Sequence, residues 1–197
     1  RKAKLLGLVK NWITVYTMNW LGCLFYMAWF IPGLTYFGKY PSGGATGAMI
    51  VTIAKNKTTA YKNYGFEGWW ANWFKSVLCN TLVSFAIFGS IASTSATGKL
   101  VVAWIPVIMF AFLGFEHVVV NMFMVAAAMW INTGGISMGD YWGWSIAPST
   151  TGNLFGALIF VSIPMWFTWG HEYRKKQKLE AKLDAAEDIA SPTTPYP

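Results

Sequence analysis

The distribution of charged side chains constrains this chain more than any other feature of its sequence. Of the charged residues among its 197, only Glu116 falls within four long stretches, 11–37, 76–98, 100–139 and 141–170. Each stretch is longer than the roughly 20 apolar residues that an α-helix needs to cross a bilayer. A soluble domain normally carries about 25% charged residues, whereas this chain carries 12%. The sequence therefore predicts an integral, multi-pass membrane protein in a lipid bilayer.

The apolar stretches predict an all-α fold with a single transmembrane domain, residues 1–170. We expect its four spans at about 12–32, 76–94, 100–130 and 149–170. The first two spans are joined by a long connection, in which residues 45–54 are apolar enough to re-enter the membrane or lie at its surface. Residues 133–148, which contain several Gly, Trp and Ser, are expected to form a loop before the last span.

Basic residues flank the apolar region at both ends. Those before the first predicted span are Arg1, Lys2, Lys4 and Lys10, and those after the last are Arg174, Lys175, Lys176, Lys178 and Lys182. Four spans put both clusters on the same side, which the positive-inside rule makes the cytoplasmic side or its organellar equivalent. We therefore expect a plasma membrane or an organellar envelope. Membrane orientation accounts for the net charge of +7, and nucleic acid is not expected as a partner.

Residues 171–197 are predicted to lie outside the membrane as a charged cytoplasmic helix followed by a disordered tail. Pairs such as Glu172 and Lys176 are four residues apart and support the helix. Residues 191–197 contain three Pro and lack the pattern of a regular element.

The third predicted span is too long for one straight helix across a bilayer. Residues 100–130 would extend about 46 Å at 1.5 Å per residue, against a hydrocarbon core of about 30 Å. Gly114, Glu116 and His117 lie near the middle of the span. We therefore expect a helix that is broken around 113–117. Non-helical backbone at membrane depth is tolerated only against protein or a water-lined cavity, so the break is a candidate transport site.

Glu116 and His117 form an ionisable pair inside the predicted membrane region. Such residues are costly in lipid and are therefore functional candidates. Glu116 can accept hydrogen bonds from backbone N–H groups that the break has freed, and so hold the loop. A His117 that is neutral in an apolar passage can give a hydrogen bond to a passing anion, and burial disfavours its protonated form until an anion arrives to pair with it. The protonated ring can then pass its proton to the anion, which lets a weak acid cross as a neutral molecule. The alternative for His117 is a packed, hydrogen-bonded histidine with no part in transport.

Several motifs resemble the formate/nitrite transporter family. Residues 114–123, Gly-Phe-Glu-His-Val-Val-Val-Asn-Met-Phe, are similar to the family's Gly-Phe-Glu-His-x-x-Ala-Asn-Met signature, with Val120 in place of the usual Ala. Residues 79–83, Cys-Asn-Thr-Leu-Val, resemble a motif before the family's fourth span. Residues 152–156, Gly-Asn-Leu-Phe-Gly, resemble a Gly-Asn-x-x-Gly motif in the sixth span, and Asn19-x-x-Gly22 is similar to the same motif in the third.

The resemblance implies an aquaporin-like, inverted-repeat helical bundle, of which this chain holds the third to sixth spans. It also implies a homopentamer with one pore in each subunit, which passes small monovalent anions such as formate or nitrite, often with a proton. In the substrate pore we expect His117 at the centre, Phe110 at an apolar constriction, and also Asn153 and Lys62. The residues expected to hold the broken loop are Gly114, Glu116 and Asn121.

Two points stay open. Lys62 corresponds to a family lysine only if a two-residue insertion follows it, and is otherwise an ordinary lysine at the membrane surface. The chain begins at Arg1 without a Met or a signal-peptide pattern, so we expect the family's first two spans to lie upstream. Without them, four spans cannot close a pore built from two inverted halves, and the alternative is a non-conducting structural subunit of a larger membrane assembly.

An enzyme is not expected. The sequence offers no cofactor motif, no set of His and Cys metal ligands and no pairing of a nucleophile with a base. We therefore expect neither a cofactor nor a metal.

Overall fold

The computed structural model describes residues 5–131 and 135–190, and all regular structure within these ranges is helical. The predicted all-α fold is therefore confirmed for the described residues. The predicted disordered tail, 191–197, lies outside them. The chain forms two compact units, Arg1–Ala157 and Leu158–Pro197.

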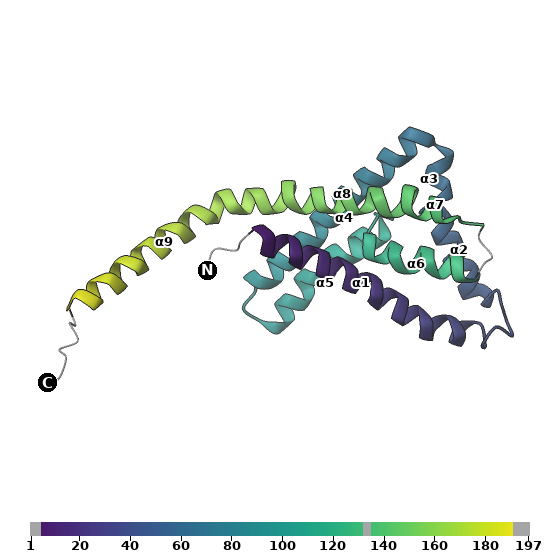
Figure 1. The fold of residues 1–197 in the computed structure, drawn as a ribbon, viewed down its shortest axis with the longest axis horizontal. Coiled ribbons are helices and arrows are strands. Elements are labelled where there is room, and N and C mark those ends of the chain that lie inside the picture. The colour runs from purple at the N-terminus through teal and green to yellow at the C-terminus, as the bar shows by residue number, and fades with distance from the viewer. Residues whose placement is uncertain (1–4, 132–134, 191–197) are drawn as a thin grey trace. The chain divides into compact units, whose positions relative to one another are not determined.

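The first unit is a bundle in which helices far apart in the sequence lie side by side. Its elements are α1 (Leu5–Leu34), α2 (Gly44–Asn56), α3 (Thr59–Asn63), α4 (Gly65–Ala92), α5 (Ala96–Phe112), α6 (Val118–Ile131), α7 (Met138–Asp140), the π-helical segment η1 (Tyr141–Ile146) and α8 (Ala147–Ala157). Helices α1 and α2 both pack on α6, and α4 packs on α5 and α8 (Figure 1). The second unit contains η2 (Leu158–Ser162) and α9 (Ile163–Ala190).

The buried core lies where α1, α2, α6 and η1 meet. Its large apolar side chains include Met27, Ile31, Ile50, Val51, Met122, Val125 and Ile146. Helix α6 contributes side chains on several sides, as expected for a helix with neighbours all round. The core thereby fixes α6, whose first residue follows directly on the predicted break.

Helices α4 and α8 approach each other closely because α8 carries glycine at the contact. A Cβ added at Gly152 would lie 2.6 Å from both the Ser76 Cβ and the Trp73 carbonyl oxygen. One added at Gly156 would lie 3.0 Å from the Val77 carbonyl carbon. Small residues let two helix backbones approach in this way in membrane proteins. The contact positions Asn153, which lies between the two glycines.

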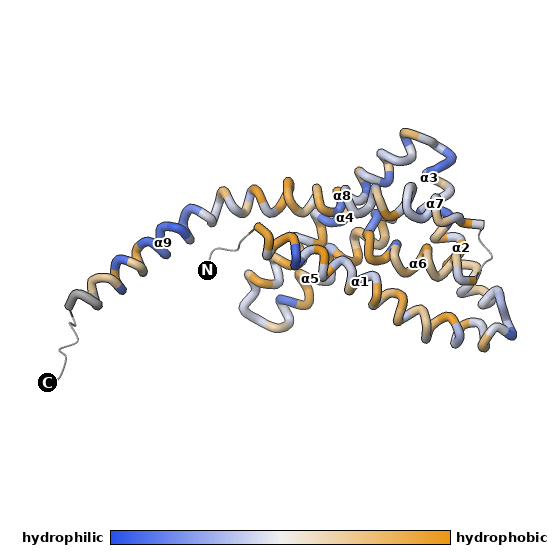
Figure 2. The backbone as a smooth tube through the Cα atoms, in the orientation of Figure 1, coloured by the Kyte–Doolittle hydropathy of each residue, from blue (hydrophilic) through white to orange (hydrophobic). Residues whose placement is uncertain are grey.

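Many apolar side chains point outward. Helix α5 has no buried residue, and its Trp104 and Phe112 are 70% and 89% exposed. Leu21, Phe25 and Trp29 form an exposed stripe at four-residue spacing on α1. Apolar surface of this extent is normally covered by lipid or by another protein. Figure 2 shows apolar residues along much of α1 and α6.

Two helical stretches among the described residues are long and apolar enough to cross a membrane, Gly65–Ala92 and Met138–Ala186. Helix α1 has 30 residues but contains many Trp, Tyr and Asn residues, which lower its mean hydropathy. Helices α5 and α6 are apolar but shorter, with 17 and 14 residues.

The expected loop at 133–148 is wrong for most of its length, since helical structure begins at Met138. The reason is a capping box. The Ser137 hydroxyl accepts a hydrogen bond from the Asp140 backbone N–H at 3.0 Å, and the Asp140 carboxylate accepts one from the Ser137 N–H at 3.1 Å. Reciprocal bonds of this kind start a helix.

Candidate functional site

The chain leaves the helical path between α5 and α6, which confirms the predicted break at 113–117. Gly114 adopts a left-handed conformation with φ of 63°. The Phe115 N–H donates to the Phe110 carbonyl at 3.0 Å, and the Gly114 N–H donates to that of Ala111 at 3.2 Å. These two bonds satisfy carbonyls at the end of α5 in the pattern of a Schellman cap, which favours glycine at the left-handed residue.

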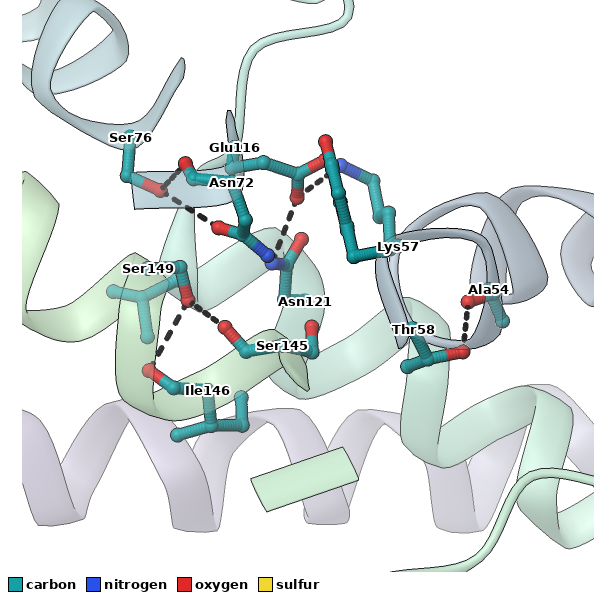
Figure 3. Close-up of polar contacts among 12 residues, drawn as sticks. Ala54, Lys57, Thr58, Asn72, Ser76, Glu116, Asn121, Ser145, Ile146 and Ser149 are labelled. Carbon is teal, nitrogen blue, oxygen red and sulfur yellow. Dashed lines mark hydrogen bonds and ion pairs between the residues drawn. The ribbon is translucent and has the colours of Figure 1, made fainter. Parts of the chain in front are cut away.

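The Glu116 carboxylate, which follows this cap, is buried and accepts three hydrogen bonds from side chains. Its Oε2 accepts from Lys57 Nζ and from Asn121 Nδ2, each at 2.9 Å, and its Oε1 accepts from the Tyr61 hydroxyl at 2.9 Å. Figure 3 shows the Lys57 and Asn121 side chains converging on this carboxylate. Glu116 therefore ties the break to α3, to α6 and to the end of α2. We expected backbone N–H donors, and the observed donors are side chains.

Tyr61 remains a donor to Glu116 over the ordinary pH range. Burial, the negative charge of Glu116 and the hydrogen bond to it all raise the pKa of the Tyr61 hydroxyl above its usual value. The phenol therefore stays protonated. One face of the Tyr61 ring also lies 5.4 Å from Lys75 Nζ, measured to the ring centroid, which is within the range of a cation–π contact.

Asn153 holds the backbone on both sides of His117. Its Oδ1 accepts from the Val118 N–H at 2.9 Å, and its Nδ2 donates to the carbonyls of Glu116 at 2.9 Å and Ser76 at 2.8 Å. Its own carbonyl accepts from Asn80 Nδ2 at 2.7 Å. The Val118 N–H is one of the free donors at the start of α6, so Asn153 caps that helix as well as clamping the break.

His117 lies against Phe110, and both rings line one cavity. The two rings are nearly parallel, with centroids 5.7 Å apart and an interplanar angle of 18°. The His117 side chain is half-buried, and its Nδ1 makes no hydrogen bond with the described residues. The cavity has a volume of about 930 Å³, and Lys57, Tyr61 and Glu116 also line it.

The expected site residues divide into two groups. His117, Phe110, Glu116 and Gly114 lie on this cavity, while Asn121 lies behind it and contacts Glu116. Lys62 and Asn153 do not line it. Lys62 Nζ instead lies 2.7 Å from the carboxylate of Asp140, which is a buried residue.

Sequence reasoning missed Lys57 and Tyr61. A buried carboxylate requires a cation or several donors, and applied to Glu116 this requirement would have indicated a lysine in the connection before α4. Lys55, Lys57 and Lys62 are all present there. Since 59 residues separate Lys57 from Glu116, no local spacing rule could choose among the three.

Glu116→Gln should strongly destabilise the first unit. The variant keeps the shape of the side chain but leaves the Lys57 charge half-buried without its partner, and breaking a buried pair typically costs about 3–5 kcal/mol. We expect a lower melting temperature and loss of the monodisperse peak in gel filtration. Glu116→Gln combined with Lys57→Met should recover part of the loss.

Glu67→Gln is the matched control for this prediction, because Glu67 lines the same cavity but is exposed. It should melt close to the wild type. Equal melting temperatures for the Glu116 and Glu67 variants would show that the Lys57–Glu116 pair does not hold the break.

Comparison with known proteins places these residues in a family. The formate/nitrite transporter family matches residues 1–167. A probable formate transporter of Methanothermobacter thermautotrophicus is 30% identical over 180 residues, which cover 86% of this chain and 62% of that protein. The formate channel FocA of Haemophilus influenzae is 32% identical over 137 residues, covering 68% of this chain and 43% of that protein.

An uncharacterised transporter of Bacillus subtilis, YrhG, is 30% identical over 182 residues, which cover 91% of this chain and 62% of that protein. The chain thus spans about three fifths of the length of the Methanothermobacter and Bacillus proteins and 43% of FocA. The match includes α1, the break with Glu116 and His117, and the α4–α8 contact. With its apolar helices, this chain is a membrane protein that belongs to the formate/nitrite transporter family.

Proposed function

We propose that the protein transports small monovalent anions, such as formate, nitrite or a similar weak-acid anion, through a pore in which His117 supplies a proton or a hydrogen bond. The observation that carries this proposal is the pair of stacked rings, His117 and Phe110, at the break between α5 and α6 and on the same cavity as Lys57. The names of the relatives, which include formate transporters and channels, support the substrate class.

The arrangement of charges suits a monovalent anion. Lys57 and Glu116 form an ion pair on the cavity, and Lys75 and Glu67 also line it, so neither sign of charge dominates and an anion that enters is not held tightly. The apolar side chains that line the cavity, such as Phe110, disfavour any charge there, because an unpaired ion in a low-dielectric medium is very costly. A proton passed from the His117 ring nitrogen to the anion's oxygen forms a neutral acid and a neutral imidazole. The ring then regains its proton from water.

In this proposal the described helices correspond to the third to sixth spans of the aquaporin-like inverted repeat. Helix α1 is the third span, α4 the fourth, α5 with α6 the broken fifth, and the helical region that starts at Met138 the sixth. The chain would then pass the membrane several times, in a plasma membrane or an organellar envelope. Asn153 and Asn121 act as positioning residues, because they hold the backbone and the carboxylate beside His117.

The experiment is radiolabelled uptake into liposomes that contain the purified protein. Formate and nitrite should enter faster than into protein-free liposomes, and lactate provides a larger monocarboxylate for comparison. Sulfate, a divalent anion that one proton cannot neutralise, should not enter faster. Uptake of formate and nitrite at the protein-free rate would contradict the proposed function.

The protein should assemble as a homopentamer in which α1 contributes to the contact between subunits. The exposed stripe of Leu21, Phe25 and Trp29 supports this proposal, because its large apolar side chains suit a packed protein interface. Light scattering in mild detergent should give the mass of five subunits, and Phe25→Glu should reduce it. A monodisperse wild-type monomer would count against the assembly.

A further inference from the structure

The charged part of α9 separates its charges onto two faces. Arg174, Lys178 and Lys182 follow one another at four-residue spacing, and Lys175 is three residues before Lys178. Positions three and four residues apart share one face of a helix. These four cations therefore form what we term the basic face of α9. Figure 2 shows the change from apolar to charged residues along this helix.

The other face of α9 is predominantly acidic. Glu172, Lys176, Glu180 and Asp184 also follow one another at four-residue spacing. The ion pair found in the described part of α9 joins Lys176 to Glu180 at 4.0 Å, in place of the expected pair of Glu172 with Lys176. Lys176 is therefore matched with acids, whereas the basic face carries four positive charges and, among the described residues, no ion pair. Its side chains are exposed.

The basic face begins directly after an aromatic, apolar segment. Trp166 and Trp169 precede it and are both more than half exposed, as is typical of tryptophans at a membrane surface. The Arg174 guanidinium lies 4.8 Å from the Trp166 ring centroid, and its Nε donates to the Gly170 carbonyl at 3.2 Å. Arg174 therefore turns back towards the apolar segment, the direction in which a long cationic side chain reaches the headgroups of a bilayer.

We propose that the basic face of α9 binds the anionic phospholipids of the membrane in which the protein lies. A negative leaflet attracts basic residues next to an apolar segment, with an effect of about fivefold in affinity for each Lys or Arg near the surface. Arg174, Lys175 and Lys178 follow Trp169 within about three helical turns, so they can reach the headgroups while the acids on the other face are turned away. A nucleic acid or an acidic protein would find the same charges, but neither accounts for the adjacent tryptophans and the position of Arg174.

The test compares two lysines that differ in face and not in charge. The full chain is placed in nanodiscs of phosphatidylcholine alone, or with about a quarter phosphatidylglycerol, and hydrogen–deuterium exchange is measured over 171–186. Phosphatidylglycerol should slow the exchange severalfold, and raising the salt from about 0.1 M to 1 M should remove the effect, because the Debye length falls from about 10 Å to 3 Å.

Lys178→Gln should reduce the protection about fivefold, and Lys176→Gln should leave it unchanged. Gel filtration checks that both variants remain folded. Equal exchange with and without phosphatidylglycerol would overturn the proposal. Equal losses of protection in the two variants would also overturn it, because the protection would then depend on net charge and not on the basic face. Protection by an RNA oligonucleotide and not by phosphatidylglycerol would assign the basic face to nucleic acid and also overturn it.

Discussion

His117→Asn should reduce formate uptake into liposomes about tenfold or more and remove its response to pH. Asn is smaller and still polar, so the Asn153 clamp on the backbone at either side of the residue is kept. The substitution removes the imidazole that we place in contact with the passing anion. A hydrogen bond to a charged group contributes about 1.5–3 kcal/mol, which corresponds to at least a tenfold change.

Wild-type uptake should rise as the pH falls from about 8 to about 5, the range in which imidazole gains its proton. A protonated ring can neutralise the anion, and the neutral acid crosses a low-dielectric constriction far more easily. The measurement is labelled formate uptake at several pH values, with folding checked by gel filtration. After subtraction of the uptake into protein-free liposomes at each pH, the Asn variant should show no such rise.

The chain offers a matched control, because it contains two histidines and the other is His171. His171 is exposed on α9, so His171→Asn removes the same ring without changing the cavity. That variant should keep the wild-type rate and pH profile. If folded His117→Asn protein does the same, His117 is a packing residue and the proposed mechanism is wrong, although transport itself would still stand.

Gly156→Ala should destabilise the first unit by about 1–3 kcal/mol, the usual cost of an added methyl group in a packed contact. The added Cβ would clash with the Val77 carbonyl, and this obstacle is backbone that cannot rotate away. Helices α4 and α8 would have to separate, and the Asn153 bonds to the Ser76 and Glu116 carbonyls would lengthen. We expect a melting temperature lower by roughly 2–12 °C.

Gly22→Ala is the control for this prediction. Gly22 belongs to the similar Asn-x-x-Gly motif in α1, but a Cβ there would meet no atom within 4 Å. The substitution should be neutral or slightly stabilising, because Ala favours a helix over Gly. Thermal melting in detergent distinguishes the two. Equal melting temperatures would show that the α4–α8 contact tolerates a side chain and that the glycines do not set its distance.

The two Asn-x-x-Gly motifs illustrate a limit of the sequence. The two motifs have the same sequence pattern, yet Gly156 lies against α4 and Gly22 faces open space. Asn153 was expected in the pore, and the structure has it bonded to three backbone groups beside the break. A motif indicates which residues can make close contacts or hydrogen bonds. The partners of these residues, however, lie in helices more than 30 residues away in the sequence.

Helix boundaries were predicted unevenly. The break at 113–117 was correct because excess length, Gly114 and the polar residues after it all indicate the same place. The start of α7 at Met138 was missed, although Ser137 and Asp140 have the spacing of a capping box. Glycine and tryptophan content suggested a loop there, and the local hydrogen bonds outweigh that tendency.

The sequence by itself determined that this chain is an all-helical membrane protein, that one helix is broken, and that Glu116 and His117 lie at the break. Each conclusion depends on hydropathy, length or a local turn, which are properties of neighbouring residues. Only the tertiary structure decided that Lys57 and Tyr61 hold Glu116 while Lys62 pairs with Asp140. A buried charge requires a partner, but the packing of α2 and α3 against the break selects which of several lysines can reach it.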